Sequence, residues 1–335
     1  MNPRYRRLLI PGLLITLLVI VVIASLAGKA DARTDDPEQV STVSDGRINE
    51  SSGLVVSPDD PDRVYTINDS GGAPVVYAVS VSSGQTLGTA TVDADFVDTE
   101  ALSVDGEGML WIADTGDNRN NRTDVALYAL PEISDGATTV DARRYPITYP
   151  GGALDVEALV VSPVTGEKFL ISKGLLGGTV FSLPEPLVED QPNEAVALAG
   201  DIPGLVTDAA FTPDGRYVLA RDYSEAYVLD PVTWGIVASS DLPQVDQGET
   251  LAVEDSGRSY LIGSEGTGSP LIRVPFSPPA PEKSAAPSAT PSATPGTGTS
   301  APPDGNGFAG ATWFWGFVVV ALLAAISAAA TTKRK

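Results

Sequence analysis

Five carboxylates occupy the same position in a short sequence motif, here called the phrase, that recurs between residues 50 and 255. In each copy the acid comes directly before an apolar run, as in Glu100-Ala-Leu-Ser-Val and Glu157-Ala-Leu-Val-Val. The five acids are Glu50, Glu100, Glu157, Asp208 and Glu249. If folding brings them together, their oxygens can ligate a hard cation such as Ca2+, Mg2+ or Mn2+, or transfer protons. We therefore treat all five as candidate metal ligands, with Ca2+ as the candidate cofactor.

Composition narrows the chemistry, because the chain contains no histidine and no cysteine. Their absence excludes Ser-His-Asp and Cys-His catalysis, zinc sites with His or Cys ligands, and structural disulfides. All 43 acids but only 14 of the 21 bases lie between Asp31 and Asp304, which gives that segment a formal charge of −29. Nucleic acid is therefore not an expected partner, since phosphate backbones require a basic surface.

The spacing of the phrase predicts the elements that carry these acids. Successive acids are 50, 57, 51 and 41 residues apart, a period typical of β-propeller blades. Each phrase is followed by a turn rich in Pro, Asp or Gly and then by further apolar runs. The last copy has no room for a fourth strand, whereas a spare strand at 39–43 precedes the first copy and could close the ring. We predict an all-β propeller of five four-stranded blades closed by this N-terminal strand, with six blades as the alternative.

The first strand of each propeller blade lines the central channel, so the phrase acids should surround one mouth of it. The ends of the second strands should reach the same mouth. They supply the candidate ligand-binding residues Asp69, Asp114, Lys173, Arg221, Tyr223 and Glu265. Glu157 is a candidate metal ligand or general base, and Lys173 and Arg221 could stabilise negative charge during catalysis. Acids at strand ends also commonly accept hydrogen bonds that only brace neighbouring blades. Because such braces would repeat as a binding site would, the repetition does not distinguish a structural role from a metal or ligand site.

The loop 114–124 is the densest local group of oxygen ligands. Its Asp and Asn side chains could form a calcium shell, but the spacing is not that of an EF-hand. Arg119 and Arg122 oppose a cation. An Asx-rich turn is therefore the favoured interpretation of this loop.

The segments outside the propeller, which we place at 38–276, indicate a membrane-tethered protein. Residues 1–32 run from basic to apolar, as in a signal sequence or an N-terminal membrane anchor. Residues 277–306 are rich in Pro, Ser and Thr and predict an extended stalk. The apolar stretch 311–330, followed by the basic tail 331–335, predicts a transmembrane helix with a cytoplasmic end. We therefore expect a protein of the cell membrane, with two flanking transmembrane helices and the propeller on the extracytoplasmic side.

Several short motifs resemble those of secreted or membrane-anchored actinobacterial β-propeller proteins. These are known as WD40-like propellers or as relatives of an esterase-like activity of phytase group. The motifs are Glu50-Ser-Ser-Gly, Asn68-Asp-Ser-Gly, Asp98-Thr-Glu-Ala, Gly116-Asp-Asn, Asp155-Val-Glu-Ala-Leu and Ser264-Glu-Gly. The resemblance covers about residues 48–274 and implies an exported propeller with a polar mouth. It does not by itself imply an esterase, because a shared fold does not carry chemistry.

Three functions are compatible with these features. The first is a binding module, without catalysis, for a small molecule, a cell-envelope component or a protein, with a calcium-type ion at the mouth. The second is a hydrolase of esters, lactones or phosphoesters that uses an oxygen-ligated metal. The third is a scaffold that binds a partner through its sides and leaves the mouth empty.

Overall fold

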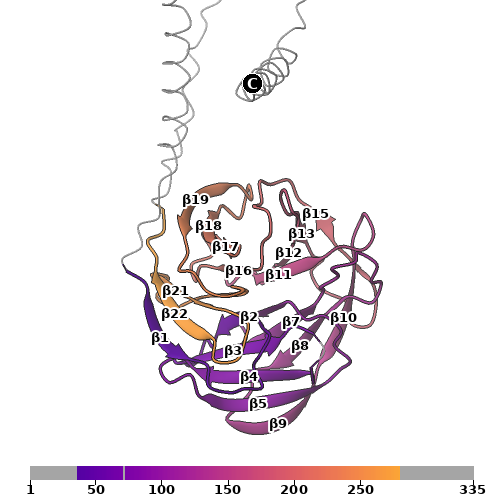
Figure 1. Cartoon of the computed structure of the whole chain (residues 1–335). Helices are drawn as coiled ribbons and strands as arrows, with labels where there is room; N and C mark the ends of the chain where they lie inside the picture. The colour runs from indigo at the N-terminus through magenta and orange to yellow at the C-terminus, as the bar shows by residue number, and fades with distance from the viewer. Residues whose placement is uncertain (1–35, 71, 280–335) are drawn as a thin grey trace, which may run out of the picture. The chain divides into compact units, whose positions relative to one another are not determined.

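The computed structural model describes residues 36–70 and 72–279, and these form a five-bladed β-propeller (Figure 1). Five sheets are arranged so that their innermost strands contact one another in a closed ring, β2 to β6, β6 to β11, β11 to β16, β16 to β20 and β20 to β2. The prediction of five blades is confirmed, and the six-bladed alternative is wrong for the described residues. The expected signal segment or anchor, the stalk beyond residue 279 and the C-terminal helix lie outside the described residues.

Each blade is a sheet whose strands follow one another from the central channel outward. Blade 1 comprises β2 (Ser51–Val56), β3 (Arg63–Asn68), β4 (Val75–Ser80), β5 (Thr86–Asp93) and β9 (Gly136–Asp141). Blade 2 comprises β6 (Ala101–Val104), β7 (Met109–Asp114), β8 (Ala126–Pro131), β10 (Arg143–Thr148) and β14 (Asn193–Glu194). Blade 3 comprises β11 (Val156–Val161), β12 (Lys168–Ser172), β13 (Val180–Ser182) and β15 (Val196–Ala197). Blade 4 comprises β16 (Asp208–Phe211), β17 (Val218–Arg221), β18 (Glu225–Leu229) and β19 (Ile236–Asp241). Blade 5 comprises β20 (Thr250–Val253), β21 (Ser259–Gly263), β22 (Pro270–Pro275) and β1 (Glu38–Thr42).

The predicted closure by the N-terminal strand is confirmed. Strand β1 pairs antiparallel with β22, with Gln39 opposite Ile272, so one blade contains the first and last described strands (Figure 1). Strands β9 and β14 were not predicted. In sequence, β9 lies between two strands of blade 2, and β14 lies between two strands of blade 3. Each nevertheless pairs in parallel with the outer strand of the preceding blade, β9 with β5 and β14 with β10. These parallel additions link neighbouring blades at their edges.

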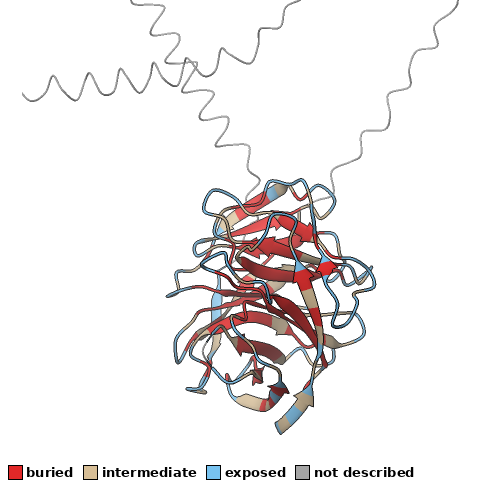
Figure 2. Ribbon diagram, turned by 90° about the vertical axis from the view of Figure 1, so that its right-hand side faces the viewer, coloured by how far each residue is buried: buried red, intermediate tan, exposed pale blue. Residues whose placement is uncertain are grey.

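The core consists of five apolar clusters, one at each interface between neighbouring blades. Alternate side chains of the strands face the neighbour on each side, and Figure 2 shows the strands largely buried and the connecting loops exposed. At the interface of blades 3 and 4, for example, the rings of Phe169 and Trp234 lie 5.0 Å apart. Burial on both faces holds the five inner strands in register, and with them the side chains at their starts. Among the described residues, no helix is long and apolar enough to cross a membrane.

Candidate functional site: an acidic mouth built from two carboxylate triads

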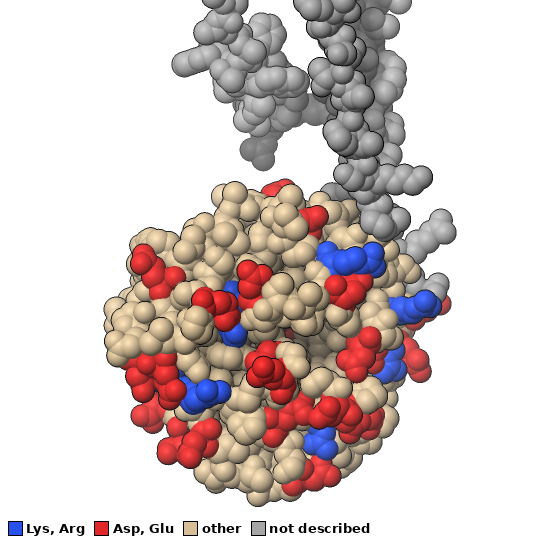
Figure 3. Space-filling model, turned by 180° about the vertical axis from the view of Figure 1, so that it is seen from behind, with Lys and Arg blue, Asp and Glu red and all other residues tan. Residues whose placement is uncertain are grey.

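The five phrase acids lie at the starts of the five inner strands, as predicted. Glu100, Glu157, Asp208 and Glu249 are buried, and Glu50 is partly buried. Glu157 is the extra residue of a β-bulge, because the pairing of β11 with β12 shifts between Val156 and Ala158. Bulges re-aim side chains at the rims of closed sheets. We call the following set the acidic mouth: Glu50, Asp69, Asp98, Glu100, Asp155, Glu157, Glu249 and Glu265, with Lys173 and Tyr223. Figure 3 shows one face of the molecule, on which acidic side chains outnumber basic ones.

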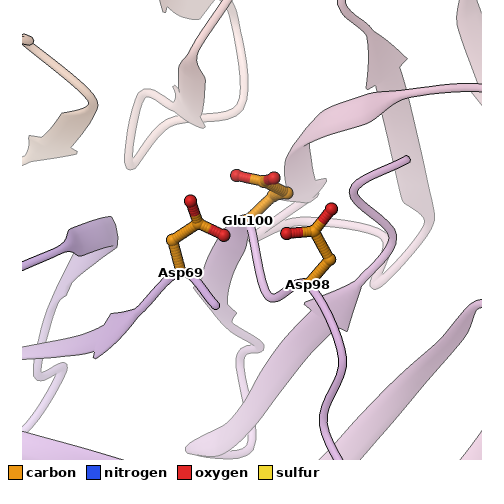
Figure 4. A group of neighbouring side chains, drawn as sticks. All are labelled: Asp69, Asp98 and Glu100. Atoms are coloured by element: carbon orange, nitrogen blue, oxygen red, sulfur yellow. The ribbon is translucent and has the colours of Figure 1, made fainter. Parts of the chain in front are cut away.

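Within the acidic mouth, two groups of three carboxylates converge and share Glu100. The first group is Asp69, Asp98 and Glu100, and the second is Glu100, Asp155 and Glu157; within each group one oxygen per residue lies within 4.8 Å of the others. Figure 4 shows the three carboxylates of the first group directed toward a common space. Two oxygens on opposite sides of a calcium ion, each at about 2.4 Å, would be about 4.8 Å apart. The spacing therefore suits a shared cation.

Backbone contacts between blades 1 and 2 bring the first group together. Asp69 follows β3, and its carbonyl accepts a hydrogen bond from the Thr99 amide at 2.9 Å. Ser70 and Asp98 form an isolated β-bridge, which joins the two loops directly. The Asp69 Oδ1 atom is buried and has no hydrogen-bond partner among the described residues. A buried, unpaired carboxylate oxygen is costly unless a ligand satisfies it, so the first group fits a bound cation.

The loop 114–124 holds an acid from each group in place through Arg122. The Arg122 guanidinium contacts Asp114 Oδ1 at 3.0 Å and donates to the Gly116 carbonyl at 2.8 Å. Asp114 Oδ1 in turn accepts a hydrogen bond from the Asp98 amide at 2.8 Å, and Asp155 Oδ1 accepts one from the Asp117 amide at 2.8 Å. The loop is thus an arginine-centred Asx turn that positions the site, which agrees with the favoured interpretation of its sequence.

Gly116 provides the room in which two of the carboxylates sit. A Cβ atom at this position would lie 2.3 Å from Glu100 Oε1 and 2.7 Å from Asp98 Oδ2. Any larger residue would displace these oxygens. Gly116 is therefore part of the construction of the first group although it contributes no ligand atom.

Burial and mutual repulsion make the acidic mouth resist full ionisation. Burial, with the neighbouring Asp98 carboxyl, raises the pKa of Asp69 to about 8. Burial, with Glu157 and Asp69, raises the pKa of Glu100 well above its usual value. Burial also raises the pKa of Glu157 to about 8, although Lys173 acts in the opposite direction. A cation would remove this repulsion, and binding it would release protons.

Lys173 supplies the positive charge on the blade 3 side of the acidic mouth. Its ammonium lies 3.1 Å from Glu157 Oε1 and 5.6 Å from the centroid of the Tyr223 ring. Although burial acts to lower it, the charges of Glu157 and Glu249 raise the pKa of Lys173 above its ordinary value. Burial and Glu249 likewise raise the pKa of Tyr223. The amine therefore remains protonated beside a carboxyl that titrates near neutrality.

Of the predicted site residues, five belong to the acidic mouth but to neither carboxylate group: Glu50, Glu249, Glu265, Lys173 and Tyr223. Three others lie outside the acidic mouth altogether. Asp208 is fully buried, and its two oxygens accept hydrogen bonds from the Ala209 and Leu251 amides at 2.8 and 2.7 Å. Arg221 is also fully buried and donates to the Asp222 and Thr250 carbonyls, each at 3.0 Å. Asp114 is held by Arg122 in the loop 114–124. For these three residues the contacts are those of braces, and Asp208 and Arg221 join blades 4 and 5.

Two acids of the site, Asp98 and Asp155, were not among the predicted site residues. Each stands two positions before a phrase acid, in Asp98-Thr-Glu100 and Asp155-Val-Glu157. The phrase acids of the other three blades have no acid at that position. The paired Asp-x-Glu pattern was therefore a signal in the sequence that distinguishes blades 2 and 3 from the rest.

The fold and the site together define a five-bladed β-propeller with an acidic mouth that could hold a metal ion. No protein-family model and no curated protein matches the chain. The predicted kinship with actinobacterial propellers therefore stays a prediction.

Solved β-propeller structures are similar to this chain at low sequence identity. A gluconolactonase from Xanthomonas campestris is 14% identical over 76% of this chain and 93% of its own, with a TM-score of 0.45. A glutaminyl cyclase from Myxococcus xanthus is 13% identical over 74% of this chain and 100% of its own, with a TM-score of 0.46. An auxiliary nutrient-binding protein from Bacteroides thetaiotaomicron is 10% identical over 73% of this chain and 77% of its own, with a TM-score of 0.42. At these values no activity or ligand is transferred to this chain.

Proposed function

We propose that this chain is a membrane-tethered, extracytoplasmic binding module whose acidic mouth holds a calcium-type cation. The observation that carries the proposal is the pair of carboxylate groups that share Glu100, together with the buried, unpaired Oδ1 atom of Asp69 among the described residues. The ligand is a small molecule, an envelope component or a protein that meets the cation and the surrounding polar groups. The membrane tether and the extracytoplasmic location rest on the terminal segments of the sequence.

Calcium suits this site better than magnesium does. Calcium accepts six to eight oxygen ligands at about 2.3–2.6 Å in flexible geometries, whereas magnesium requires a near-ideal octahedron and retains several waters. The two groups supply crowded carboxylate oxygens from three separate segments of chain, at Asp69, at 98–100 and at 155–157. The set contains no histidine or thiolate that would favour zinc or copper.

The test is to titrate Ca2+, then Mg2+ and Mn2+, into the full chain in detergent while heat of binding and Tm are measured. We expect stoichiometric binding of Ca2+. At a hundredfold excess over Kd this stabilises the native state by about 2.7 kcal/mol, which raises Tm by about 5–10 °C. Glu100→Gln should abolish the effect. Glu107→Gln removes one exposed acid from the β6–β7 turn, at the opposite end of the same blade, and should leave it intact.

Absence of saturable binding by all three ions would refute the cation site. Binding that survives Glu100→Gln would place the ion elsewhere. In either case the acids at the strand starts would be braces, and a search for partners would turn to the sides of the propeller.

A second function, metal-dependent hydrolysis of an ester, lactone or phosphoester, is favoured by one observation. The Lys173 ammonium lies 3.1 Å from Glu157, a buried carboxyl with a pKa of about 8. When bound, a cation would polarise the substrate oxygen. Glu157 can accept a proton from water near neutral pH, and Lys173 can stabilise the negative charge that develops. A panel of these substrates with the calcium-loaded chain tests this function. Glu157→Gln should remove turnover without lowering the metal-free Tm, and an inert wild-type chain would refute it.

A further inference from the structure

The mouth face of blades 4 and 5 contains a groove of about 1010 Å³, separate from the two carboxylate groups. Its walls are the segment 241–247, which runs from the end of β19 toward β20, and the loop 264–269, between β21 and β22. Tyr223 and Glu265, at one end, also belong to the acidic mouth. Gln39 of the outermost strand β1 lies at the other end. The groove therefore runs from the mouth toward the rim of the propeller, a shape that suits an extended ligand.

The lining of the groove is acidic and contains no base. Asp241, Asp246 and Glu265 line it, and no Lys or Arg of the described residues does. None of these three acids takes part in an ion pair within the described part of the chain. Asp241 and Asp246 are accessible for contact, since each is exposed. Electrostatic complementarity therefore disfavours phosphorylated and other anionic ligands and favours a cationic one.

The groove also offers apolar and aromatic surface beside these acids. Val245 and Ile272, which are partly buried, contribute aliphatic surface to the wall, and the buried Leu242 lines it from the core. Tyr223 is 39% exposed at the inner end, and its ring already lies within cation–π distance of the Lys173 ammonium. Aliphatic wall next to carboxylates matches the side chains of Arg and Lys, which combine an apolar stem with a charged head.

Two positions of the wall, on either side of Thr267, carry no side chain. Gly266 and Gly268 have φ values of 90° and 76°, and a Cβ at Gly266 would meet nothing within 4 Å. A main chain can approach the wall closely at these two glycines. An extended peptide has the required shape, and its alternate side chains would point to the same wall.

We propose that the groove binds an extended basic segment of a partner protein, with Arg or Lys side chains on Asp241, Asp246 and Glu265. This inference deepens the proposed role as a binding module by naming the class of partner, and it rests on that proposed function. It does not require the cation, because none of the groove acids belongs to the two carboxylate groups.

The test is fluorescence anisotropy with a labelled peptide of four Gly-Arg repeats added to the full chain in detergent. A Gly-Gln peptide of the same length controls for charge. We expect saturable binding of the Gly-Arg peptide that weakens as salt is raised, because the pairs are exposed. The double variant Asp241→Asn/Asp246→Asn should weaken binding about tenfold. Glu107→Gln/Glu189→Gln removes two exposed acids outside the groove and should change Kd by less than about twofold.

Three results would overturn the proposal. The first is that the Gly-Arg peptide does not bind saturably. The second is that the control variant loses as much affinity as the groove variant, which would indicate attraction to overall charge only. The third is that the Gly-Gln peptide or a neutral oligosaccharide binds as tightly as the Gly-Arg peptide. Repeating the titration with Glu100→Gln separates this inference from the cation site. Peptide binding that persists while calcium binding is lost supports the groove alone, and peptide binding that disappears with calcium binding refutes its independence.

Discussion

Gly116→Ala should separate the stability of the propeller from the integrity of its acidic mouth. The added Cβ would lie 2.3 Å from Glu100 Oε1 and 2.7 Å from Asp98 Oδ2, whereas an ordinary contact needs about 3.4 Å. The two oxygens must therefore move by about 1.1 and 0.7 Å, the differences between these values. Calcium–oxygen distances vary over only about 0.3 Å, so a displacement of this size removes at least one ligand. Changes of this kind beside a metal site typically weaken binding about 10–100-fold, or about 1.4–2.7 kcal/mol.

Stability should hardly change in this variant. The displaced atoms are the ends of side chains, and the φ of Gly116 is not in the left-handed region, so alanine introduces no backbone strain. The reduced entropy of the unfolded chain favours alanine by about 0.4–1 kcal/mol. We expect a metal-free Tm within about 4 °C of the wild type and a raised calcium Kd by calorimetry. Gly106→Ala is the matched control, because its Cβ would meet only Pro163 O at 3.7 Å. An unchanged Kd in Gly116→Ala would refute a cation between Asp98 and Glu100.

Three further outcomes follow from the contacts of the site. Without a cation, stability should fall as pH rises from about 5 to 9: the raised pKa values of Asp69 and Glu157, each about 8, mean that the native state holds protons that the unfolded chain loses near pH 4. Chemical unfolding across this range measures how the free energy of unfolding depends on pH. Asp69→Asn should make this dependence weaker, and a wild-type free energy that does not change with pH would contradict the prediction. Asp208→Asn should cost about 1–3 kcal/mol, since one of two buried amides loses its acceptor, while the calcium Kd stays unchanged. Arg122→Ala should weaken calcium binding about tenfold or more by releasing the loop that holds Asp98 and Asp155, and normal affinity in a folded variant would dismiss this positioning role.

The blade count and the ring closure could be predicted because each depends on patterns local in sequence. In the sequence, an acid followed by apolar residues marks the start of every inner strand, and the turns between strands contain Pro, Asp and Gly. Strand β9 could not be predicted in the same way. Residues 136–141 are polar and largely exposed, and they become a strand only because β5 of the preceding blade offers a free edge in parallel register. Two-residue strands such as β14 depend in the same manner on a neighbour distant in sequence.

The five phrase acids were predicted as a ring of equivalent residues at the mouth, and the structure shows why they are not equivalent. The sequence repeat fixes the backbone position of each acid. The hydrogen-bond donors and charged groups that contact its carboxylate, however, come partly from other blades. Asp208 meets two backbone amides, one of them from blade 5, and needs no further partner. Among the described residues, the Glu100 carboxylate accepts a hydrogen bond only from the Ser52 hydroxyl, at 3.4 Å. It lies beside four other carboxylates instead. An Asp is short enough to be saturated by the adjoining backbone, whereas a Glu at the same position extends past it toward the mouth. The single aspartate of the five is thus the brace, and the two glutamates preceded by Asp-x are the residues at which a cation can be held.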